Sequence, residues 1–219
     1  MAKQLRSQAT RAAIITGAAG VFNEHGFKRA TLEAAADAAG VTKGALYFHF
    51  PSKIDLANAV IQTQHEISRK YAMAAFARGA SALESLMWMS RGLAEQMRNE
   101  VVVSAGIRLS TESGSGELSR DAPYVDWMDA VEALLREAIN QGDVHQAQDP
   151  ATLARFIIPA YTGVQLVSDV VHQRNDLYER VREMWEVLLP AIVVPERASL
   201  ATSLPELITQ PFRGIGGTR

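Results

Sequence analysis

The sequence predicts an all-α protein with a small N-terminal module of three helices and a larger helical body. Three observations support this fold class. Apolar residues recur at three- and four-residue spacing along most of the chain, and Ser, Thr or Asp residues suited to helix capping precede several of these segments. No segment alternates apolar and polar residues as a half-buried strand would. With 219 residues and 47% hydrophobic content, the chain is long enough for one large or two small domains, and we expect nine or ten helices.

The first two helices are predicted over residues 7–24 and from Thr31 to Gly40. Gly26 is a natural terminator of the first helix. Thr31 is suited to cap the second, with Glu33 in its first turn, where the helix dipole favours an acid. One buried stripe of the first helix consists of Ile14, Ile15, Ala18, Ala19 and Phe22.

A third, very short helix is predicted to begin after Thr42 and to stop before Pro51. The run Ser52-Lys-Ile-Asp55 resembles a capping box and predicts the start of a fourth helix. That helix has no breaker before about Arg78. It is therefore long enough to link two modules rigidly.

The body contains further helices with recognisable starts. Ser81 to Glu84 forms a second capping box, and Asp149-Pro150 places a cap before a proline at the first helical position. The polar stretch over residues 111–122 predicts a loop. The remaining helices are expected over residues 101–109, 124–141, 150–172 and from 175–176 to a stop at Pro190, and the tail after residue 195 is expected to be flexible after a short helix.

Charge is distributed unevenly along the chain. Residues 1–53 contain seven Lys or Arg residues against three acids, a balance of +4, so the remainder is −6 because the whole chain is −2. A basic N-terminal segment on an acidic body suggests a module that faces nucleic acid, joined to a domain with another task. The same four charges are also compatible with a solvated face.

The segment GVTKGALYFHFPSK gathers polar groups at the start of the third helix. Two short helices joined at Gly40-Val41 and preceded by a packing helix form a helix-turn-helix, whose second helix enters the DNA major groove. Gly44 would let the backbone approach DNA closely. Thr42 and Lys43 lie at the helix N-terminus, which favours anions, and Tyr47, His49 and Lys53 can donate to phosphate. Alternatively, Tyr47 and His49 are only surface residues of a small helix. The apolar Val41, Leu46, Phe48 and Phe50 are expected, at least in part, to anchor it.

The run ATLEAAADAAGVTKGALYFHFPSKIDLANAV resembles the DNA-binding segment of the tetracycline-repressor (TetR-type) family of bacterial transcription regulators. The resemblance implies a homodimer whose two recognition helices bind palindromic operator DNA. It also implies DNA contacts at Thr31, Thr42, Lys43, Gly44, Tyr47, His49 and Lys53.

A further resemblance is spread over most of residues 1–195. MAKQLRSQATRAAII, GVTKGALYFHFPSK, VVVSAGIRLSTES, the tryptophan at 127 and YTGVQLVSDVV are similar to the γ-butyrolactone receptor subgroup of that family. This implies a repressor that a small diffusible lactone releases from DNA, with control of antibiotic genes. The implied domains are a DNA-binding domain over residues 1–52, a ligand-binding and dimerisation domain over 53–195, and a flexible tail over 196–219.

The residues of the body suggest an apolar pocket with few polar groups. The side chains expected to line it are Leu83, Leu86, Met87, Trp88, Met89, Leu109, Trp127 and Val131, although Met and Trp stripes at helical spacing are commonly plain core.

Trp127 combines a large apolar face with one N–H donor, which suits an apolar ligand that has a carbonyl group. The resemblance implies that Trp127 is the tryptophan with which the subgroup contacts its ligand, and that Gln64 and Thr162 are further ligand contacts. Without that match, Gln64 is expected to be exposed and Thr162 to bond its own helix backbone. Some members of the subgroup have a threonine in place of Val131, so one ligand hydrogen bond would be missing here.

A ligand-driven release requires a dimer with two states. The helices over 150–172 and 176–189 are expected to form the dimer face, with small and apolar residues such as Ile157, Ala160, Gly163 and Val167. The alternative is that these residues are buried inside one protomer. The long helix that starts at Ser52 and contains Gln64 is the expected transmitter of the ligand signal.

Other classes of protein find little support. The sequence has no HExxH, GxSxG or P-loop, its five histidines have no metal-ligand spacing, and it has no cysteine, so we expect neither an enzyme, a cofactor nor a metal. The N-terminus lacks the apolar core of a signal peptide and no run is long enough to span a bilayer, which favours a cytoplasmic protein. A related repressor (pseudo-receptor) that responds to an antibiotic or another hydrophobic ligand stays open. A structural DNA-binding protein would not need the large acidic body.

Overall fold

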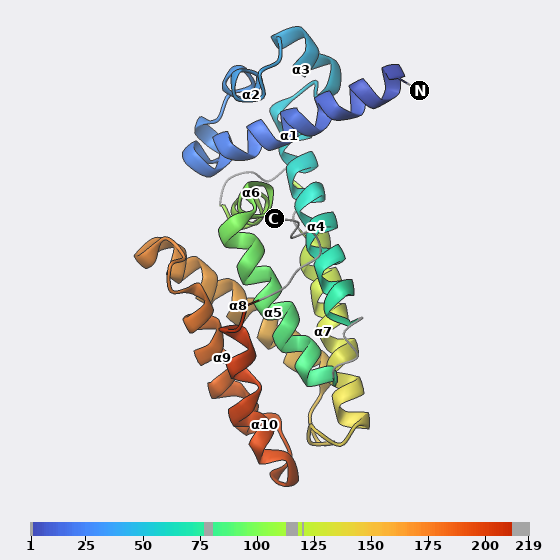
Figure 1. Cartoon of the computed structure of the whole chain (residues 1–219), viewed down its shortest axis with the longest axis vertical. Coiled ribbons are helices and arrows are strands. Elements are labelled where there is room, and N and C mark those ends of the chain that lie inside the picture. The colour runs from blue at the N-terminus through green and yellow to red at the C-terminus, as the bar shows by residue number, and fades with distance from the viewer. Residues whose placement is uncertain (1, 77–80, 113–117, 120, 212–219) are drawn as a thin grey trace. The chain divides into compact units, whose positions relative to one another are not determined.

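The computed structural model describes residues 2–76, 81–112, 118–119 and 121–211, and over these residues the predicted all-α class is confirmed (Figure 1). Within the described part of the chain, the only extended pairing is an isolated bridge between Val144 and Val193. No described helix is long and apolar enough to cross a membrane. The α-helices are α1 (Ala2–Arg29), α2 (Leu32–Ala38), α3 (Lys43–His49), α4 (Lys53–Phe76), α5 (Ala82–Asn99), α6 (Val101–Thr111), α7 (Asp121–Asn140), α8 (Pro150–His172), α9 (Leu177–Ile192) and α10 (Ala198–Ser203).

Contacts divide the chain into two compact units. Unit 1 combines residues 1–69 with 96–122, and unit 2 combines 70–95 with 123–219. The division falls inside α4, inside α5 and near the start of α7 rather than at residue 52, because α6 packs on α1 and the first part of α4 shares the core of unit 1. Unit 1 therefore contains more than the predicted DNA-binding domain.

The predicted helix starts are confirmed by their capping hydrogen bonds. Thr31 Oγ1 accepts the N–H of Ala34 at 3.1 Å, and Ser52 Oγ accepts the N–H of Asp55 at 3.1 Å. At the start of α8, Asp149 accepts from the N–H groups of Ala151 and Thr152. These signals are local, since each cap satisfies a backbone donor that the helix itself leaves free.

Several boundaries differ from those expected from the sequence. Helix α1 begins at Ala2, and the expected break at Gly26 is present as a kink with φ 69°. Pro190 does not end α9, which continues to Ile192. A proline removes one backbone donor but can be tolerated close to a helix end, so the helix stops two residues later.

The tail also differs from expectation. Residues Pro195–Arg197 and Pro205–Ile208 form 3-10 turns on either side of α10, and the second turn packs against α9 with Ile208 fully buried. Only residues 212–219 of the expected flexible tail lie outside the described residues.

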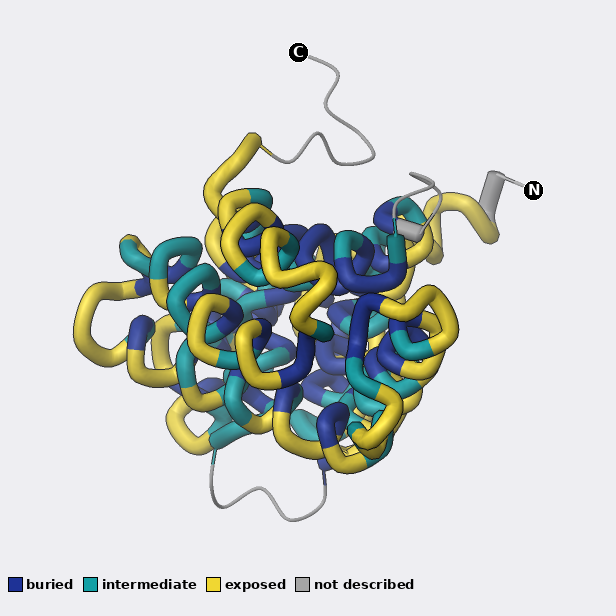
Figure 2. Tube along the Cα trace, turned by 90° about the horizontal axis from the view of Figure 1, so that it is seen from below, coloured by how far each residue is buried: buried dark blue, intermediate teal, exposed yellow. Residues whose placement is uncertain are grey.

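The core of unit 1 is formed by the predicted stripe of α1 together with α2, α3, α4 and α6. Ile14, Ala18 and Leu46 are fully buried there, and Phe22 and Phe50 nearly so. The burial colours in Figure 2 alternate along the helices between buried and exposed residues, as expected for amphipathic helices with one buried face. Gly17 permits α1 and α2 to meet, because a Cβ at this position would lie 2.7 Å from the backbone nitrogen of Ala39.

The core of unit 2 contains a buried polar layer at the C-terminal half of α5. Tyr161 on α8 donates to the Ser90 carbonyl at 2.9 Å, and Trp185 Nε1 on α9 donates to Ser90 Oγ at 3.0 Å. Burial raises the pKa of Tyr161, so this hydroxyl keeps its proton.

The guanidinium of Arg91 continues this layer. It is 5% exposed, pairs with Glu95 at 2.6 Å and lies 3.9 Å from the centroid of the Tyr178 ring. Its Nε donates to the main-chain carbonyl of Gln210 at 2.9 Å, which fixes the C-terminal segment to α5.

Candidate functional site

The helix-turn-helix expected from the sequence is formed by α2 and α3. Gly40 links them with φ 65°, a conformation that residues other than glycine rarely adopt. The N–H of Val41 donates to the Ala36 carbonyl at 3.0 Å, and Thr42 Oγ1 caps α3 by accepting from Ala45 at 3.2 Å. The geometry of this turn fixes the direction of α3 relative to α2 and α1.

The N-terminal end of α3 is exposed. We define the α3 surface as Thr42, Lys43, Gly44, Tyr47 and Phe48, all of which are solvent-accessible. A Cβ at Gly44 would meet nothing closer than Thr42 Oγ1 at 4.0 Å, so the backbone there is open to a close approach. Lys43 lies 3.6 Å from Glu33, but both side chains are largely exposed, so this ion pair leaves the ammonium available.

Phe48 was not predicted as a surface residue. Leu46 and Phe50 are buried and anchor α3 as expected, whereas Phe48 is 80% exposed and packs edge-on against the His49 ring. Its position four residues after Gly44 is the signal that places it on the same helix face. An exposed aromatic ring beside a lysine and a glycine suits contact with a nucleic-acid backbone or base.

Lys53 and Thr31, two further predicted DNA contacts, also make hydrogen bonds within the fold. Lys53 Nζ donates to the carbonyls of Lys28 and Ala30 and lies 4.7 Å from the Phe27 ring centroid. Thr31 is exposed and caps α2. A DNA contact for both stays a prediction, and Lys53 also holds the end of α1 against the start of α4.

The predicted ligand-contacting residues fall in both units. Gln64 and Leu109 belong to unit 1, and the others belong to unit 2. Within unit 2, Leu83, Leu86, Met87, Trp88 and Met89 are all buried, so α5 is enclosed on more than one face. Trp88 Nε1 donates to Glu84 at 3.4 Å, so this indole is also held by its own helix.

Gln64 is 3% exposed, so the interpretation of this residue as solvent-exposed is wrong. Its Nε2 donates to Ser68 Oγ at 3.2 Å, and Ser68 donates to Gln96 Oε1 at 2.9 Å. Gly106 on α6 explains the burial, because a Cβ there would lie 2.4 Å from Gln64 Cβ. The three polar side chains connect α4 to α5 inside unit 1.

In unit 2, α7 and α8 meet at a tyrosine that sequence reasoning missed. Trp127 is half-buried and Val131 is buried, and Tyr124 lies one turn before Trp127 on the same face of α7. Burial raises the pKa of Tyr124, and a hydrogen bond with Thr162 on α8 lowers it by less. The phenol therefore stays protonated and can donate or accept beside the Trp127 ring.

Thr162 also donates to the Ile158 carbonyl at 2.9 Å, as expected for a threonine that bonds its own helix. Its oxygen can still accept a hydrogen bond. We use the name ligand wall for the predicted contacts of unit 2 together with Tyr124, namely Leu83, Leu86, Met87 and Trp88 of α5, Tyr124, Trp127 and Val131 of α7 and Thr162 of α8.

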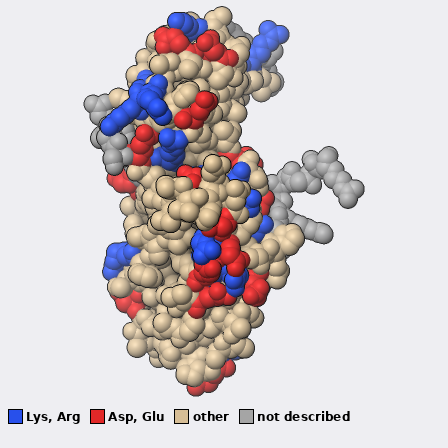
Figure 3. Space-filling model, turned by 90° about the vertical axis from the view of Figure 1, so that its left-hand side faces the viewer, with Lys and Arg blue, Asp and Glu red and all other residues tan. Residues whose placement is uncertain are grey.

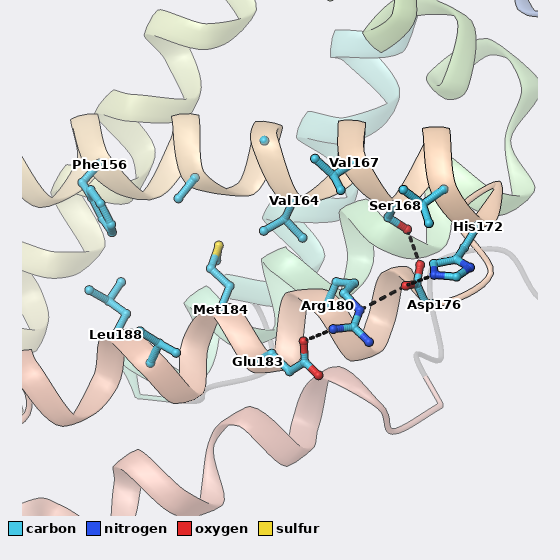
Figure 4. Close-up of a pocket in the computed structure, with 14 residues that line it drawn as sticks. Phe156, Val164, Val167, Ser168, His172, Asp176, Arg180, Glu183, Met184 and Leu188 are labelled. Atoms are coloured by element: carbon cyan, nitrogen blue, oxygen red, sulfur yellow. Dashed lines mark hydrogen bonds and ion pairs between the residues drawn. The ribbon is translucent and has the colours of Figure 1, made fainter.

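A groove of about 800 Å³ runs between α8 and α9 on the surface of unit 2 (Figure 4). Phe156, Val164, Val167, Met184 and Leu188 line most of it. At one end, Asp176 accepts from Ser168 at 2.6 Å and from Arg180 at 3.0 Å, and His172 lies 3.7 Å away. We call this surface the α8–α9 groove.

Exposed valines are found both in the lining of the α8–α9 groove and on α8 beside it. Val167 and Val187 of the lining are 63% and 80% exposed, and Val170, which is not part of the lining, is 85% exposed. Of the predicted dimer-face residues, Ile157 is instead buried inside the protomer, whereas a Cβ at Gly163 would meet no neighbour within 4 Å.

Acidic and basic groups are interleaved elsewhere. On the face in Figure 3, red and blue side chains lie next to one another between wide uncharged areas. On α9, Arg182 pairs with Glu179 and Glu186, and Arg180 pairs with Glu183 at 2.5 Å. Several carboxylates of α9 are therefore paired with arginine. Among the described residues, no group of three or more His, Asp or Glu side chains could hold a metal ion.

A helix-turn-helix whose second helix exposes a lysine, an open glycine and aromatic rings, joined to a helical body, defines the class of DNA-binding regulators with a separate sensing domain. Comparison with known proteins agrees. Residues 14–60 match the family described as "Bacterial regulatory proteins, tetR family", and residues 80–195 match the "Tetracyclin repressor-like, C-terminal domain". The chain belongs to the tetR family.

Particular relatives narrow the position of the chain within that family. The A-factor receptor protein of Streptomyces griseus is 37% identical over 195 residues, which cover 89% of this chain and 68% of the relative. A solved γ-butyrolactone receptor described as ArpA-like is 35% identical, with a TM-score of 0.77 over 92% of this chain and 98% of that one. A structure described under the molecular basis for control of antibiotic production by bacterial hormones is 37% identical, with a TM-score of 0.78 over 85% and 98% of the two chains. The chain is thus a tetR-family regulator similar to γ-butyrolactone receptors.

Proposed function

We propose that this protein is a homodimeric transcriptional repressor that binds palindromic operator DNA and is released by a small γ-butyrolactone-type signal. The single observation that best supports DNA binding is the α3 surface, in which the backbone at Gly44 is open to a close approach between the exposed side chains of Lys43 and Tyr47. The similarity to γ-butyrolactone receptors supports the lactone, and the similarity to a protein that controls antibiotic production supports antibiotic genes as targets. We also propose that the protein is cytoplasmic, because the chromosome that it would bind lies in the bacterial cytoplasm.

DNA recognition would use the α3 surface in the major groove. Thr42, Lys43 and Tyr47 would bind phosphates or base edges at the positive end of the α3 dipole, and Thr31 and His49 would contact the backbone alongside. Lys53 would contribute through its remaining N–H and by fixing α4 against α1. Exposed Phe48 would add an apolar contact, for example to a thymine methyl group.

Dimerisation is typical of the tetR family, and we propose that the α8–α9 groove is the face used. A second copy of the same groove would cover the exposed valines, and the two-fold axis would place two α3 helices on two half-sites. Gly163 would allow the two copies of α8 to approach closely.

The signal would bind at the ligand wall. Trp127 would stack on an apolar lactone, while its N–H, Tyr124 and Thr162 would supply polar contacts. Release then follows from linkage: a ligand that prefers a dimer state with a different spacing of α3 helices weakens DNA binding by its difference in affinity. A hundredfold release needs a difference of about 2.7 kcal/mol.

Gln64 and its partners would transmit this change. Two of the three chain crossings between the units occur in helices that this hydrogen-bonded group joins, because α4 crosses after residue 69 and α5 returns before Gln96; the third crossing lies near the start of α7. A shift of α5 caused by the ligand would therefore be passed to α4. Direct contact of Gln64 or Leu109 with the ligand stays a prediction.

The test is fluorescence anisotropy of a labelled palindromic duplex from the protein's own upstream region, with and without a panel of γ-butyrolactones. We expect nanomolar binding and release by at least one lactone. Trp127→Ala should bind the same duplex with unchanged affinity but require at least about tenfold more lactone for release. If the protein binds the duplex and no lactone releases it, the assignment as a repressor stands and the assignment of a lactone as its signal is wrong.

A further inference from the structure

Gln165 on α8 is a buried glutamine whose side-chain amide makes no hydrogen bond with the described residues. The residue is 1% exposed, and neither Nε2 nor Oε1 has a hydrogen-bond partner among the described residues. Buried amides are normally paired because an unpaired buried donor or acceptor destabilises the folded state. Gln64 and Gln96 in unit 1 follow that rule through Ser68.

The polar groups nearest to Gln165 along α8 are already engaged. Tyr161, one turn before it, donates to the Ser90 carbonyl at 2.9 Å. Ser168, almost one turn after it, donates to Asp176 at 2.6 Å. Each of these hydroxyl groups has given its one proton to another acceptor, so neither can donate to Gln165 Oε1 without breaking that hydrogen bond, although both oxygens can still accept from Nε2.

The position of Gln165 on α8 indicates where its amide lies. At about 100° per residue, it projects about 40° from Tyr161, which contacts α5, and about 60° from Thr162, which contacts Tyr124 of α7. The side chain thus points into the interior of unit 2 between α5 and α7, on the side of the ligand wall. It is not among the residues that line the α8–α9 groove of Figure 4.

We propose that Gln165 is a specificity-determining ligand contact that selects a lactone carrying a hydroxyl group. This inference rests on the proposed function. A lactone ring has oxygen acceptors only, which would satisfy Nε2 but leave Oε1 unpaired. A ligand hydroxyl beside the ring supplies the missing donor. A site built to hydrogen-bond a hydroxyl rejects the analogue that lacks it far more strongly than an apolar pocket rejects a change of one methylene.

Two measurements on the full-length protein test this. The first is the melting temperature of the ligand-free protein for wild type, Gln165→Leu and the control Gln96→Leu, which removes a buried glutamine that is paired. We expect Gln165→Leu to melt at or above the wild-type temperature, because it replaces an unpaired amide with an apolar side chain of similar size. Gln96→Leu should melt below the wild type, since it leaves the Ser68 hydroxyl without its acceptor.

The second measurement is calorimetric affinity for two γ-butyrolactones with the same acyl chain, one with a hydroxymethyl and one with a methyl substituent on the ring. Wild type should bind the hydroxymethyl compound at least about tenfold more tightly, and Gln165→Leu should bind the two within about threefold. Preference retained by Gln165→Leu would overturn the proposal, as would a fall in its melting temperature like that of Gln96→Leu. A buried water that completes the amide would give that fall.

Failure of the proposed function gives a different pattern. If wild type binds neither compound, the lactone assignment is lost. The melting temperatures then still decide whether the Gln165 amide is unpaired in the ligand-free protein. A melting temperature of Gln165→Leu at or above that of wild type supports a polar ligand as the partner of the amide, and a lower melting temperature overturns the proposal.

Discussion

The α3 surface and the α8–α9 groove both expose apolar side chains, but they differ in what surrounds those side chains. On α3, exposed Tyr47 and Phe48 stand beside Lys43 and an open backbone at Gly44. In the groove, exposed valines extend along two helices, and charge is confined to one end, where arginine, histidine and carboxylates already pair with one another. A surface that offers a solvent-exposed cation and backbone access suits an anionic polymer, whereas one that offers matched branched aliphatic groups suits a second copy of itself.

The largest expected effect comes from placing a charge in the groove. Val167→Glu should convert the dimer to a monomer, because two carboxylates would be buried near the two-fold axis without partners. DNA affinity should fall at least about a hundredfold, since each monomer binds only one half-site. Analytical ultracentrifugation and anisotropy measure the two effects.

The matched control is Val125→Glu, at an exposed valine of α7 outside the groove. It should leave both the dimer and DNA binding unchanged. If Val167→Glu stays dimeric, the groove is not the dimer face and the distinction between the two surfaces is lost.

Adding one methyl group to α3 tests the open backbone. Gly44→Ala should lower DNA affinity about tenfold, because the new Cβ would stand where the phosphate backbone approaches. The folded protein should be stabilised by about 0.5–1 kcal/mol, since alanine favours a helix and the position is sterically free.

Gly20→Ala is the control for this change, because it also adds a Cβ in open space within a helix. It should raise stability by a similar amount and leave DNA affinity as it is. Unchanged DNA binding by Gly44→Ala would contradict a close approach at this residue.

A smaller effect is expected from Lys43→Ala. Loss of one phosphate contact should reduce affinity roughly threefold to tenfold and lower the slope of log affinity against log salt by about one. Stability should hardly change, because the exposed pair with Glu33 contributes little. Anisotropy titrations over a salt series measure the slope, and an unaltered slope would exclude a phosphate contact for this lysine.

The smallest effect concerns the charged end of the groove at acid pH. The hydrogen bond from Ser168 holds the pKa of Asp176 below its usual range. A lowered folded-state pKa gives stability that is present above the unfolded pKa, near 4, and is lost as the pH falls through the folded value. Ser168→Ala should therefore begin acid unfolding at a slightly higher pH than wild type, measured by circular dichroism. Coinciding acid transitions would show that Asp176 does not depend on Ser168.

The sequence predicted those features of the fold that depend on near neighbours. Thr31, Thr42, Ser52 and Asp149 each cap a helix through a donor within three residues, so composition and spacing were sufficient. The class of the fold and the helix-turn-helix follow from the same local rules.

Features that depend on distant parts of the chain were not predictable from these rules. Gln64 is buried because a glycine 42 positions later brings α6 against it, and Phe48 is exposed because Leu46 and Phe50 already fill the core beneath α3. The unpaired amide of Gln165 could not be recognised from the sequence, since its sequence neighbours do not show which hydrogen-bonding groups from other helices lie near it in the fold.

The hydrogen bond from Arg91 to residue 210 has a consequence for how this protein can vary. The acceptor is a main-chain carbonyl, which every amino acid provides, so the side chain at this position is free to change. The number of residues between α9 and the carbonyl is not free, because one deletion would move a different peptide group over the guanidinium. Across related chains, this segment should accordingly diverge in amino-acid identity while resisting insertions and deletions.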